Sequence, residues 1–201
     1  MNIILASSSP RRAEILTQLG LKFKAVAADI DEQVAPNEAA KDYVVRVAQE
    51  KLAAVSGAHE NALVIAADTV VVLDEYILGK ATDKQQAQAM LQALCGREHR
   101  VYTALAMGFK GQEFVDLAQA MVRMKAYDEA LLQAYLHCGE WQGKAGACAL
   151  QGRGGMLVDS VQGEFYTVVG LSLTSLYRGF EALGLQEVVL QALAQVPLKE
   201  V

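Results

Sequence analysis

The sequence predicts an α/β fold in which helices flank a mixed β-sheet. In the first half of the chain, apolar runs of strand length alternate with segments of helical periodicity, as in parallel strands joined by helices. In the middle, residues 99–109 and 113–125 predict two long antiparallel strands joined around Lys110-Gly111-Gln112. No linker, internal repeat or low-complexity tract interrupts the chain, so we expect a single domain over residues 1–201.

The N-terminal stretch predicts a short buried strand that runs into a helix. Ile3–Ala6 is apolar, and a turn of three serines follows it. Ser9 stands at the expected N-cap, and Pro10 suits the first helical position because its missing N–H loses no hydrogen bond there. Gly20 is placed to end the helix in a left-handed conformation.

Similar patterns predict the remaining elements. Asp83 and Asp128 are placed as N-caps of two helices, and Gly96 and Gly139 as the residues that end them. The further expected elements are a strand over 22–28, a helix over 37–57, a strand over 62–67 that resumes over 70–73, a return over 76–80, a second hairpin formed by 156–161 and 165–169, a helix over 172–184 and a last short helix.

Composition limits the classes of protein to consider. The chain is 53% hydrophobic, but it has no apolar run of the ~18 residues that a membrane span needs, and its N-terminus lacks the pattern of a signal peptide. Its three cysteines are scattered and form no CxxC or Cys/His cluster. This usage favours a reducing compartment over disulfides or structural zinc. We therefore expect a cytoplasmic protein without a membrane partner.

The charge distribution favours a small anionic ligand. The net charge of −5 speaks against general binding of nucleic acid. Residues 1–24 nevertheless carry a local charge of +3, because four basic residues there oppose the single acid Glu14: Arg11, Arg12, Lys22 and Lys24. A positive region in an acidic chain suits a small anion better than a polymer.

The turn before the first predicted helix has the chemistry of a phosphate site. A helix N-terminus offers free N–H groups and the positive end of the helix dipole. Here three serine hydroxyls and the guanidinium groups of Arg11 and Arg12 stand beside it, which suits a phosphate chain. An ordinary capped helix with solvated arginines is the alternative.

Two charged residues interrupt apolar patterns further along the chain. Lys51 lies one turn beyond Val47 on the stripe of its helix that faces inward, and Asp68 lies among the apolar residues of 62–73. A charge in such a place is costly to bury unless it is paired or used. The alternatives are that Lys51 extends to solvent and that Asp68 serves as a cap or turn residue. The return over 76–80 presents Lys80 beside the strand of Asp68.

Several standard sites are absent from the sequence. It contains no GxxxxGK[ST], no complete GxGxxG, no GxSxG and no HExxH. The three histidines, His59, His99 and His137, are far apart in sequence, and each is predicted to lie at the surface or to be satisfied by a hydrogen bond. A serine hydrolase or a histidine-ligated metal enzyme is therefore disfavoured.

Taken together, the segments that carry this chemistry resemble the Maf family of nucleoside triphosphate pyrophosphatases. The resemblance rests on Leu5–Arg12, Ala67–Val71 and the run from Gly143 to Gly152, and it continues through Glu50-Lys51, Gly79-Lys80 and Val169-Gly170-Leu171. The doubled arginine after the proline, Thr69 and Gln151 are similar to the branch that acts on dTTP and UTP.

The resemblance implies a two-lobed fold with a central cleft and hydrolysis of the triphosphate to the monophosphate and pyrophosphate. Asp68 would be the general base, and Glu32, together with Asp68, would hold a divalent metal, Mg²⁺ or Mn²⁺. The phosphates would be bound by Ser7, Ser9, Arg11, Arg12, Lys51 and Lys80. Arg12, Thr69 and Gln151 would set the choice of base. The family also suggests a homodimer and a role in cleaning the nucleotide pool.

The sequence departs from the family pattern in the glycine-rich segment. Gly143, Cys148 and Ala149 stand where the family usually has Asp, Tyr and Gly. Because that tyrosine is expected to line the nucleotide pocket, Cys148 bears on base preference and on whether modified pyrimidine nucleotides are accepted. The competing hypothesis is a nucleotide-binding regulator of cell division or septum formation that has no catalytic activity.

Overall fold

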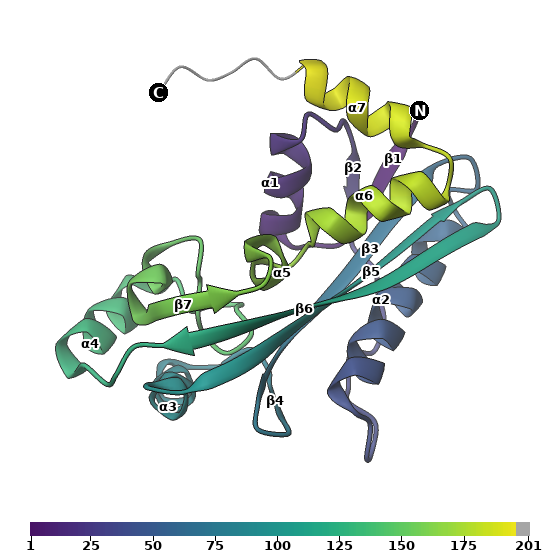
Figure 1. The fold of residues 1–201 in the computed structure, drawn as a ribbon. Coiled ribbons are helices and arrows are strands. Elements are labelled where there is room, and N and C mark those ends of the chain that lie inside the picture. Colours follow the sequence, from purple (N-terminus) through teal and green to yellow (C-terminus); the bar gives the residue numbers. More distant parts are fainter. Residues whose placement is uncertain (196–201) are drawn as a thin grey trace. The chain divides into compact units, whose positions relative to one another are not determined.

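A computed structural model describes residues 1–195 (Figure 1). Its strands are β1 (Ile3–Ala6), β2 (Lys24–Val26), β3 (Leu63–Leu73), β4 (Tyr76–Leu78), β5 (Glu98–Phe109), β6 (Gln112–Met124) and β7 (Val158–Gln162). Its helices are α1 (Pro10–Gln18), α2 (Ala40–Ser56), α3 (Lys84–Leu94), α4 (Glu129–Cys138), the 3₁₀ helix η1 (Arg153–Leu157), α5 (Phe165–Val169), α6 (Leu173–Ala182) and α7 (Gln186–Gln195). None of these helices is long and apolar enough to cross a membrane.

The strands form one mixed sheet, which confirms the predicted fold class. Their order is β2-β1-β3-β5-β6-β7, and β4 pairs with the end of β3. β1 runs parallel to both of its neighbours, so Leu5 lies opposite Ala25 of β2 and Ile65 of β3. β4 pairs with β3, and β7 with β6, in antiparallel fashion. The parallel start and the long central hairpin are those that the sequence predicts, whereas the pairing of β7 with β6 is not.

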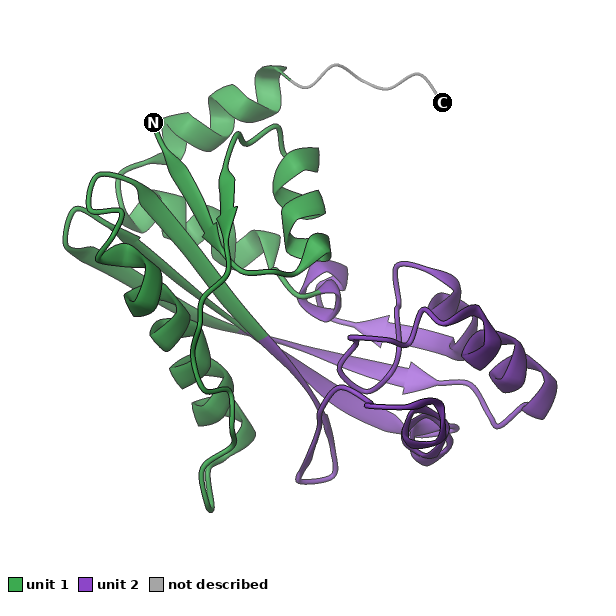
Figure 2. Cartoon of the chain, turned by 180° about the vertical axis from the view of Figure 1, so that it is seen from behind, with its two compact units in different colours: residues 1–68, 104–117, 170–201 green, residues 69–103, 118–169 purple. Residues whose placement is uncertain are grey.

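The chain divides into two compact units (Figure 2). The first contains residues 1–68, 104–117 and the described chain from Gly170 onward, and the second contains residues 69–103 and 118–169. The predictions of a single domain over residues 1–201 and of a cleft between two lobes stay predictions.

Helices cover both faces of the sheet in the first unit. Adjacent residues of a strand point to opposite faces. On β5, Gly108 lies against Leu52 of α2, so a Cβ at that position would be 3.2 Å from a Leu52 methyl carbon. Its neighbour Met107 meets α6, where a Cβ on Gly179 would collide with the methionine sulfur. α2 and α6 therefore pack on opposite faces of β5, and Figure 1 shows them on either side of it.

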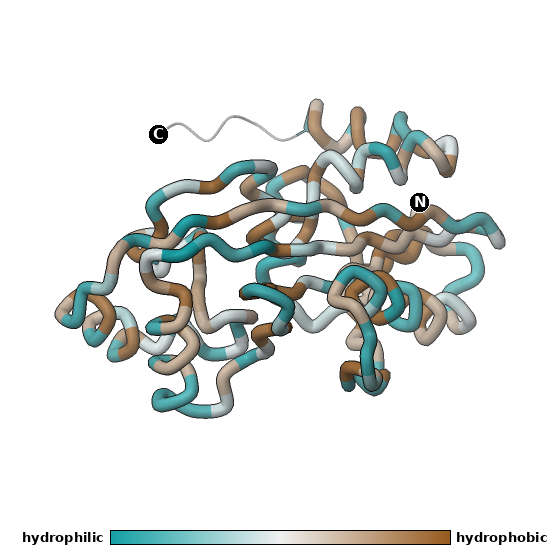
Figure 3. Tube along the Cα trace, turned by 60° about the horizontal axis from the view of Figure 1, so that its bottom comes forward, coloured by the Kyte–Doolittle hydropathy of each residue, from teal (hydrophilic) through white to brown (hydrophobic). Residues whose placement is uncertain are grey.

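The second unit has an apolar core of its own. Buried side chains of α3 and α4, such as Leu91 and Leu132, pack with Val101 of β5 and Val122 of β6. In the first unit, helix α7 carries both hydrophobic and hydrophilic residues (Figure 3), and Val189 is its buried side chain.

Most of the predicted helix ends are confirmed. The carboxylates of Asp83 and Asp128 accept hydrogen bonds from the N–H groups of Gln86 and Leu131, as N-caps do. Gly20, Gly96, Gly139 and Gly184 all have positive φ just beyond the helices that they end.

Four predicted elements are wrong or too long. Residues 165–169 form helix α5 and not a strand, because five apolar and β-branched residues fit a strand and a buried helical turn equally well. The expected strand over 156–161 is reduced to β7, since η1 takes up the residues as far as Leu157. Helix α2 begins at Ala40, because Asn37 has a φ of 61° and cannot be part of a right-handed helix. Strand β2 has three residues.

His99 contradicts the prediction that the histidines lie at the surface or are satisfied. It is 5% exposed on β5, and its Nδ1 is buried without a hydrogen-bond partner among the described residues. Burial lowers the pKa of His99 from its ordinary value of 6.5 to about 4. The imidazole is therefore neutral at physiological pH.

We expect His99 to weaken the fold on acidification. Its folded pKa lies below its unfolded pKa, so between about pH 6.5 and 4 the unfolded chain binds more protons. Stability is therefore full above pH 6.5 and falls as the pH falls towards 4, by about 2–3 kcal/mol at pH 4.5. Urea unfolding at pH 7.5 and 4.5 measures this loss of stability. Between these two pH values, the unfolding free energy of His99→Leu should fall by about 2–3 kcal/mol less than that of the wild type. Equal losses in both proteins would contradict the assignment.

Candidate active site

The turn between β1 and α1 organises one group of the predicted site residues. The Ser7 side chain is buried, and its Oγ accepts hydrogen bonds from the Ser9 N–H at 3.2 Å and from Arg12 Nη1 at 3.0 Å. Since these bonds use the oxygen as acceptor, the Ser7 hydroxyl hydrogen is the part of the group that can donate to a ligand. Ser9 stands at the N-cap as predicted, but its side chain makes no capping bond.

Arg12 is buried, which contradicts the alternative of a solvated arginine. It is 8% exposed, and its Nε donates to the Gly170 carbonyl at 2.8 Å. Burial lowers the pKa of the Arg12 guanidinium, while the negative charges of Asp68 and Glu32 oppose this shift. A desolvated guanidinium at a helix N-terminus is a strong partner for an anion. Arg11, its neighbour, is half-buried.

A buried ion pair joins α2 to β3. Lys51 is 6% exposed, and its Nζ lies 2.8 Å from Asp68 Oδ1 and 2.7 Å from Glu32 Oε1. The alternative in which Lys51 extends to solvent is therefore wrong. So is the alternative of a cap or turn for Asp68, which lies within the continuous strand β3. The first unit thus brings Lys51, Asp68 and Glu32 together as the resemblance implies.

The two carboxylates fit a divalent cation that is shared with a substrate. Glu32 and Asp68 each present an oxygen within 2.8 Å of the same ammonium group, so both point at one position. Among residues 1–195, no cluster of three or more His, Cys, Asp or Glu side chains could hold a metal by itself. Mg²⁺ commonly binds through one or two carboxylates plus substrate phosphates and water, which matches this donor set.

In the second unit, a chain of hydroxyl groups fixes the orientation of Thr69. Thr103 is fully buried, and its hydroxyl donates to the Thr167 carbonyl at 2.7 Å. The Thr69 and Thr103 oxygens lie 2.9 Å apart. Because Thr103 has spent its only hydrogen on the carbonyl, Thr69 must be the donor in this second bond. Towards any further partner, the Thr69 oxygen can therefore act only as an acceptor.

Backbone contacts place Lys80 next to the glycine-rich segment. Lys80 forms an isolated antiparallel bridge with Ala145, and the Gly146 N–H donates to the Gly79 carbonyl at 3.0 Å. Gly146 is required here, because its φ is +63° and a Cβ would lie 3.1 Å from a Val71 methyl carbon. The Lys80 side chain itself is exposed.

The loop that carries Gln151 is held by Tyr135. The buried Tyr135 hydroxyl donates to the Ala147 carbonyl at 3.2 Å and accepts from the Ala149 N–H at 3.0 Å. Cys148 lies between these two residues, with its Sγ 3.6 Å from the Gly154 carbonyl oxygen. Burial raises the pKa of the Cys148 thiol to about 12, so it is protonated at neutral pH. The Gln151 side chain is exposed at the end of this loop.

Three residues that contact the segments of predicted site residues were missed from the sequence. Thr103, Tyr135 and Arg46 belong to no recognised motif, and they bond to the carbonyls of Thr167, Ala147 and Gln33, which lie 64, 12 and 13 positions away. Only Arg46 gave a local signal, since its spacing to Glu50 is the i,i+4 spacing of a helical ion pair.

Comparison with known proteins identifies the family of this chain. The family model described as "Maf-like protein" matches residues 2–183. This chain belongs to the Maf family. Three curated relatives are each named dTTP/UTP pyrophosphatase. The relative from Myxococcus xanthus is 44% identical, over a match that covers 91% of this chain and 93% of the relative. The one from Clostridioides difficile is 41% identical and covered to 92%, over 88% of this chain. The one from Shewanella sp. is 43% identical and covered to 93%, over 86% of this chain.

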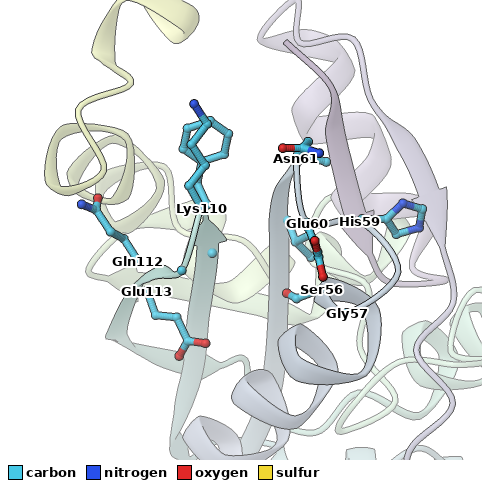
Figure 4. Close-up of a pocket in the computed structure, with 13 residues that line it drawn as sticks. Ser56, Gly57, His59, Glu60, Asn61, Lys110, Gln112 and Glu113 are labelled. Carbon is cyan, nitrogen blue, oxygen red and sulfur yellow. The ribbon is translucent and has the colours of Figure 1, made fainter.

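A pocket of the first unit lies away from the candidate site residues. It has a volume of about 510 Å³ and lies in the first unit, between the end of α2, the start of β3 and the turn from β5 to β6 (Figure 4). None of the candidate site residues lines it. Its polar lining residues include Ser56, His59, Glu60, Asn61, Lys110 and Glu113.

We expect Lys51→Met to destabilise the protein, whereas Lys80→Met should not. Removing the Lys51 ammonium leaves the buried Asp68 carboxylate without its ion-pair partner, at a cost of about 2–4 kcal/mol. Lys80 is exposed, so its replacement should change the unfolding free energy by no more than ~0.5 kcal/mol. Urea unfolding of both variants at pH 7.5 measures the difference. Equal stabilities would show that the ion pair adds nothing to the fold.

Proposed function

We propose that this Maf protein hydrolyses UTP and dTTP to the nucleoside monophosphate and pyrophosphate. The observation that carries the proposal is the group formed by Lys51, Asp68 and Glu32, with the buried Arg12 close enough for its charge to interact with both carboxylates. Cations that bind phosphate and a carboxylate that accepts a proton are what hydrolysis of a phosphoanhydride requires. The names of the relatives support the same reaction.

The proposed reaction is a displacement at the α-phosphorus. The oxygen of a water molecule forms a bond to the α-phosphorus, the bond from that phosphorus to the bridging oxygen breaks, and pyrophosphate leaves with the bonding electron pair. Asp68 accepts the proton that the water loses. Ser7, Ser9 and Arg12 would bind phosphate oxygens, with Arg11 beside them, while Lys51 and Lys80 neutralise the leaving group.

Glu32 and Asp68 would hold the divalent cation, Mg²⁺ or Mn²⁺. When bound, the ion supplies positive charge that offsets the charge on the phosphate oxygens. In the protein without ligand, the Lys51 ammonium supplies that charge between the two carboxylates. Lys51 would therefore have to turn towards the phosphates as the cation binds.

The proposed preference for uracil and thymine rests on the polarity of Thr69. Both bases carry a hydrogen on N3, whereas N3 of cytosine is an acceptor. The Thr69 oxygen can only accept, because its hydrogen is bonded to Thr103, so it suits the N3–H of uracil or thymine and repels the cytosine nitrogen. Gln151 would bind a carbonyl of the base, and its amide alone cannot exclude cytosine because it can flip.

The remaining parts of the proposal concern the setting of the reaction. A role in cleaning the nucleotide pool, in the cytoplasm, as a homodimer and without a nucleic-acid or membrane partner, follows from the family and the composition and stays a prediction. So does the effect of Cys148 on modified pyrimidine nucleotides.

The first test concerns Asp68 as the general base. We expect Asp68→Asn to lower kcat for UTP by ~10²–10⁴-fold, because an amide keeps the shape of the carboxylate but cannot accept the proton. The measurement is release of pyrophosphate at saturating Mg²⁺, with the Kd for a non-hydrolysable UTP analogue as the control for binding. A variant that keeps near-normal turnover would remove Asp68 from the mechanism. A wild-type protein that binds nucleotide but releases no pyrophosphate would favour the regulator hypothesis instead.

The second test concerns base choice. We expect the wild type to prefer UTP and dTTP over CTP, GTP and ATP, and Gln151→Ala to reduce that preference. Thr103→Val keeps the side-chain shape but frees the Thr69 hydroxyl to donate, so the ratio of kcat/KM for UTP to that for CTP should fall about tenfold, in line with ~1–3 kcal/mol for one mismatched hydrogen bond. Thr103→Ser keeps the hydroxyl and is the matched control. An unchanged ratio in Thr103→Val would contradict the role given to Thr69.

A further inference from the structure

The segment that carries Glu32 has little structure of its own. Residues 27–39 lie between β2 and α2 and contain neither helix nor strand, and most of their side chains are exposed. Figure 2 shows this stretch running beside α2 within the first unit. An exposed segment with few buried apolar contacts is expected to move unless polar contacts hold it. Yet Glu32 Oε1 lies 2.7 Å from Lys51 Nζ. Polar contacts elsewhere in the segment must therefore hold Glu32 in this position.

Arg46 of α2 makes the contacts that could do this. Its guanidinium forms a two-pronged ion pair with Glu38, from Nε at 2.6 Å and from Nη2 at 2.9 Å. Nη2 also donates to the carbonyl of Gln33, the residue next to Glu32, at 3.0 Å. Nη1 bonds to Glu50 one turn further along α2, at 3.1 Å, which anchors the guanidinium on the helix.

Glu38 and Tyr43 extend this network to the backbone on both sides of Gln33. Glu38 Oε2 accepts from the Ala35 N–H at 2.9 Å, and the Tyr43 hydroxyl donates to the Glu32 carbonyl at 2.8 Å. The Arg46 guanidinium also lies over the Tyr43 ring, 5.5 Å from its centroid. The hydrogen bond from Arg46 lowers the pKa of Glu38 to about 2, which keeps that carboxylate charged and the network closed at physiological pH.

We propose that Arg46 is a positioning residue, which holds Glu32 against Lys51 by fastening the irregular segment to α2. A two-pronged arginine contact fixes direction as well as distance, which a single point charge does not. Arg46 makes its own hydrogen bonds to Gln33, Glu38 and Glu50. Its effect on catalysis rests on the proposed function, because it passes through Glu32.

The first readout needs no activity. Amide hydrogen exchange of the full chain without nucleotide, followed by mass spectrometry, should show exchange at least tenfold faster in peptides covering residues 31–38 for Arg46→Met. Exchange in β3 should be unchanged. Arg97→Met is the matched control, because Arg97 forms an exposed ion pair with Asp74 in the second unit. Unchanged exchange in residues 31–38 of Arg46→Met would overturn the proposal.

The second readout separates positioning from a general structural role. For UTP hydrolysis, Arg46→Met should lower kcat/KM about tenfold and raise the Mg²⁺ concentration for half-maximal rate, and Arg46→Lys should recover only part of the loss. In the Glu32→Gln background, the same Arg46→Met change should have less than a twofold effect, because its route to the site is already removed. Fully additive effects would overturn the proposal. A wild type without pyrophosphatase activity would overturn the proposed function, and the exchange data alone would then decide whether Arg46 holds the segment.

Discussion

The ion pair between Lys51 and Asp68 is the interaction on which the arrangement of the first unit depends. Neither charge is stable in an apolar interior without the other, so helix α2 and strand β3 must pack in the one register that brings them within 2.8 Å. Glu32 joins the same ammonium from an irregular segment. The packing of α2 on β3 therefore also assembles this part of the candidate site, because Lys51 and Asp68 specify how the helix lies on the strand.

The proposed roles are divided between the two units. The residues proposed to handle water and metal, and all those proposed for phosphate except Lys80, belong to the first unit, whereas Lys80, Thr69 and Gln151 belong to the second. The boundary in β3 falls between Asp68 and Thr69, the proposed base and a proposed reader of the pyrimidine ring. One strand would thus supply both proposed functions from consecutive residues, so a shift in its register would disturb both at once.

Much of the fold could be predicted from the sequence because its signals are local. Aspartate caps, terminal glycines and the two long strands of the central hairpin each depend on a few neighbouring residues, and the structure confirms them. The prediction of a strand over residues 165–169 failed because a short run of apolar and β-branched residues does not distinguish a strand from a helical turn. Charges in apolar patterns singled out Lys51 and Asp68, whereas the proposed roles of Thr69 and Gln151 came from the family resemblance. The hydrogen-bond partners of the candidate residues could not be predicted, since Arg12 bonds to Gly170 and Thr103 to Thr167 across long stretches of chain that no local pattern records.

The Tyr135 hydroxyl bonds to the main chain on either side of Cys148 and not to Cys148 itself. The path of the loop is therefore set by groups that every amino acid possesses, and the side chain at position 148 is not needed to define it. Such a position can change during evolution while the backbone around it keeps its course. Cys148 therefore stands at a position where the side chain can vary with little effect on how the loop folds, so a change in ligand preference there would not require a change in the backbone.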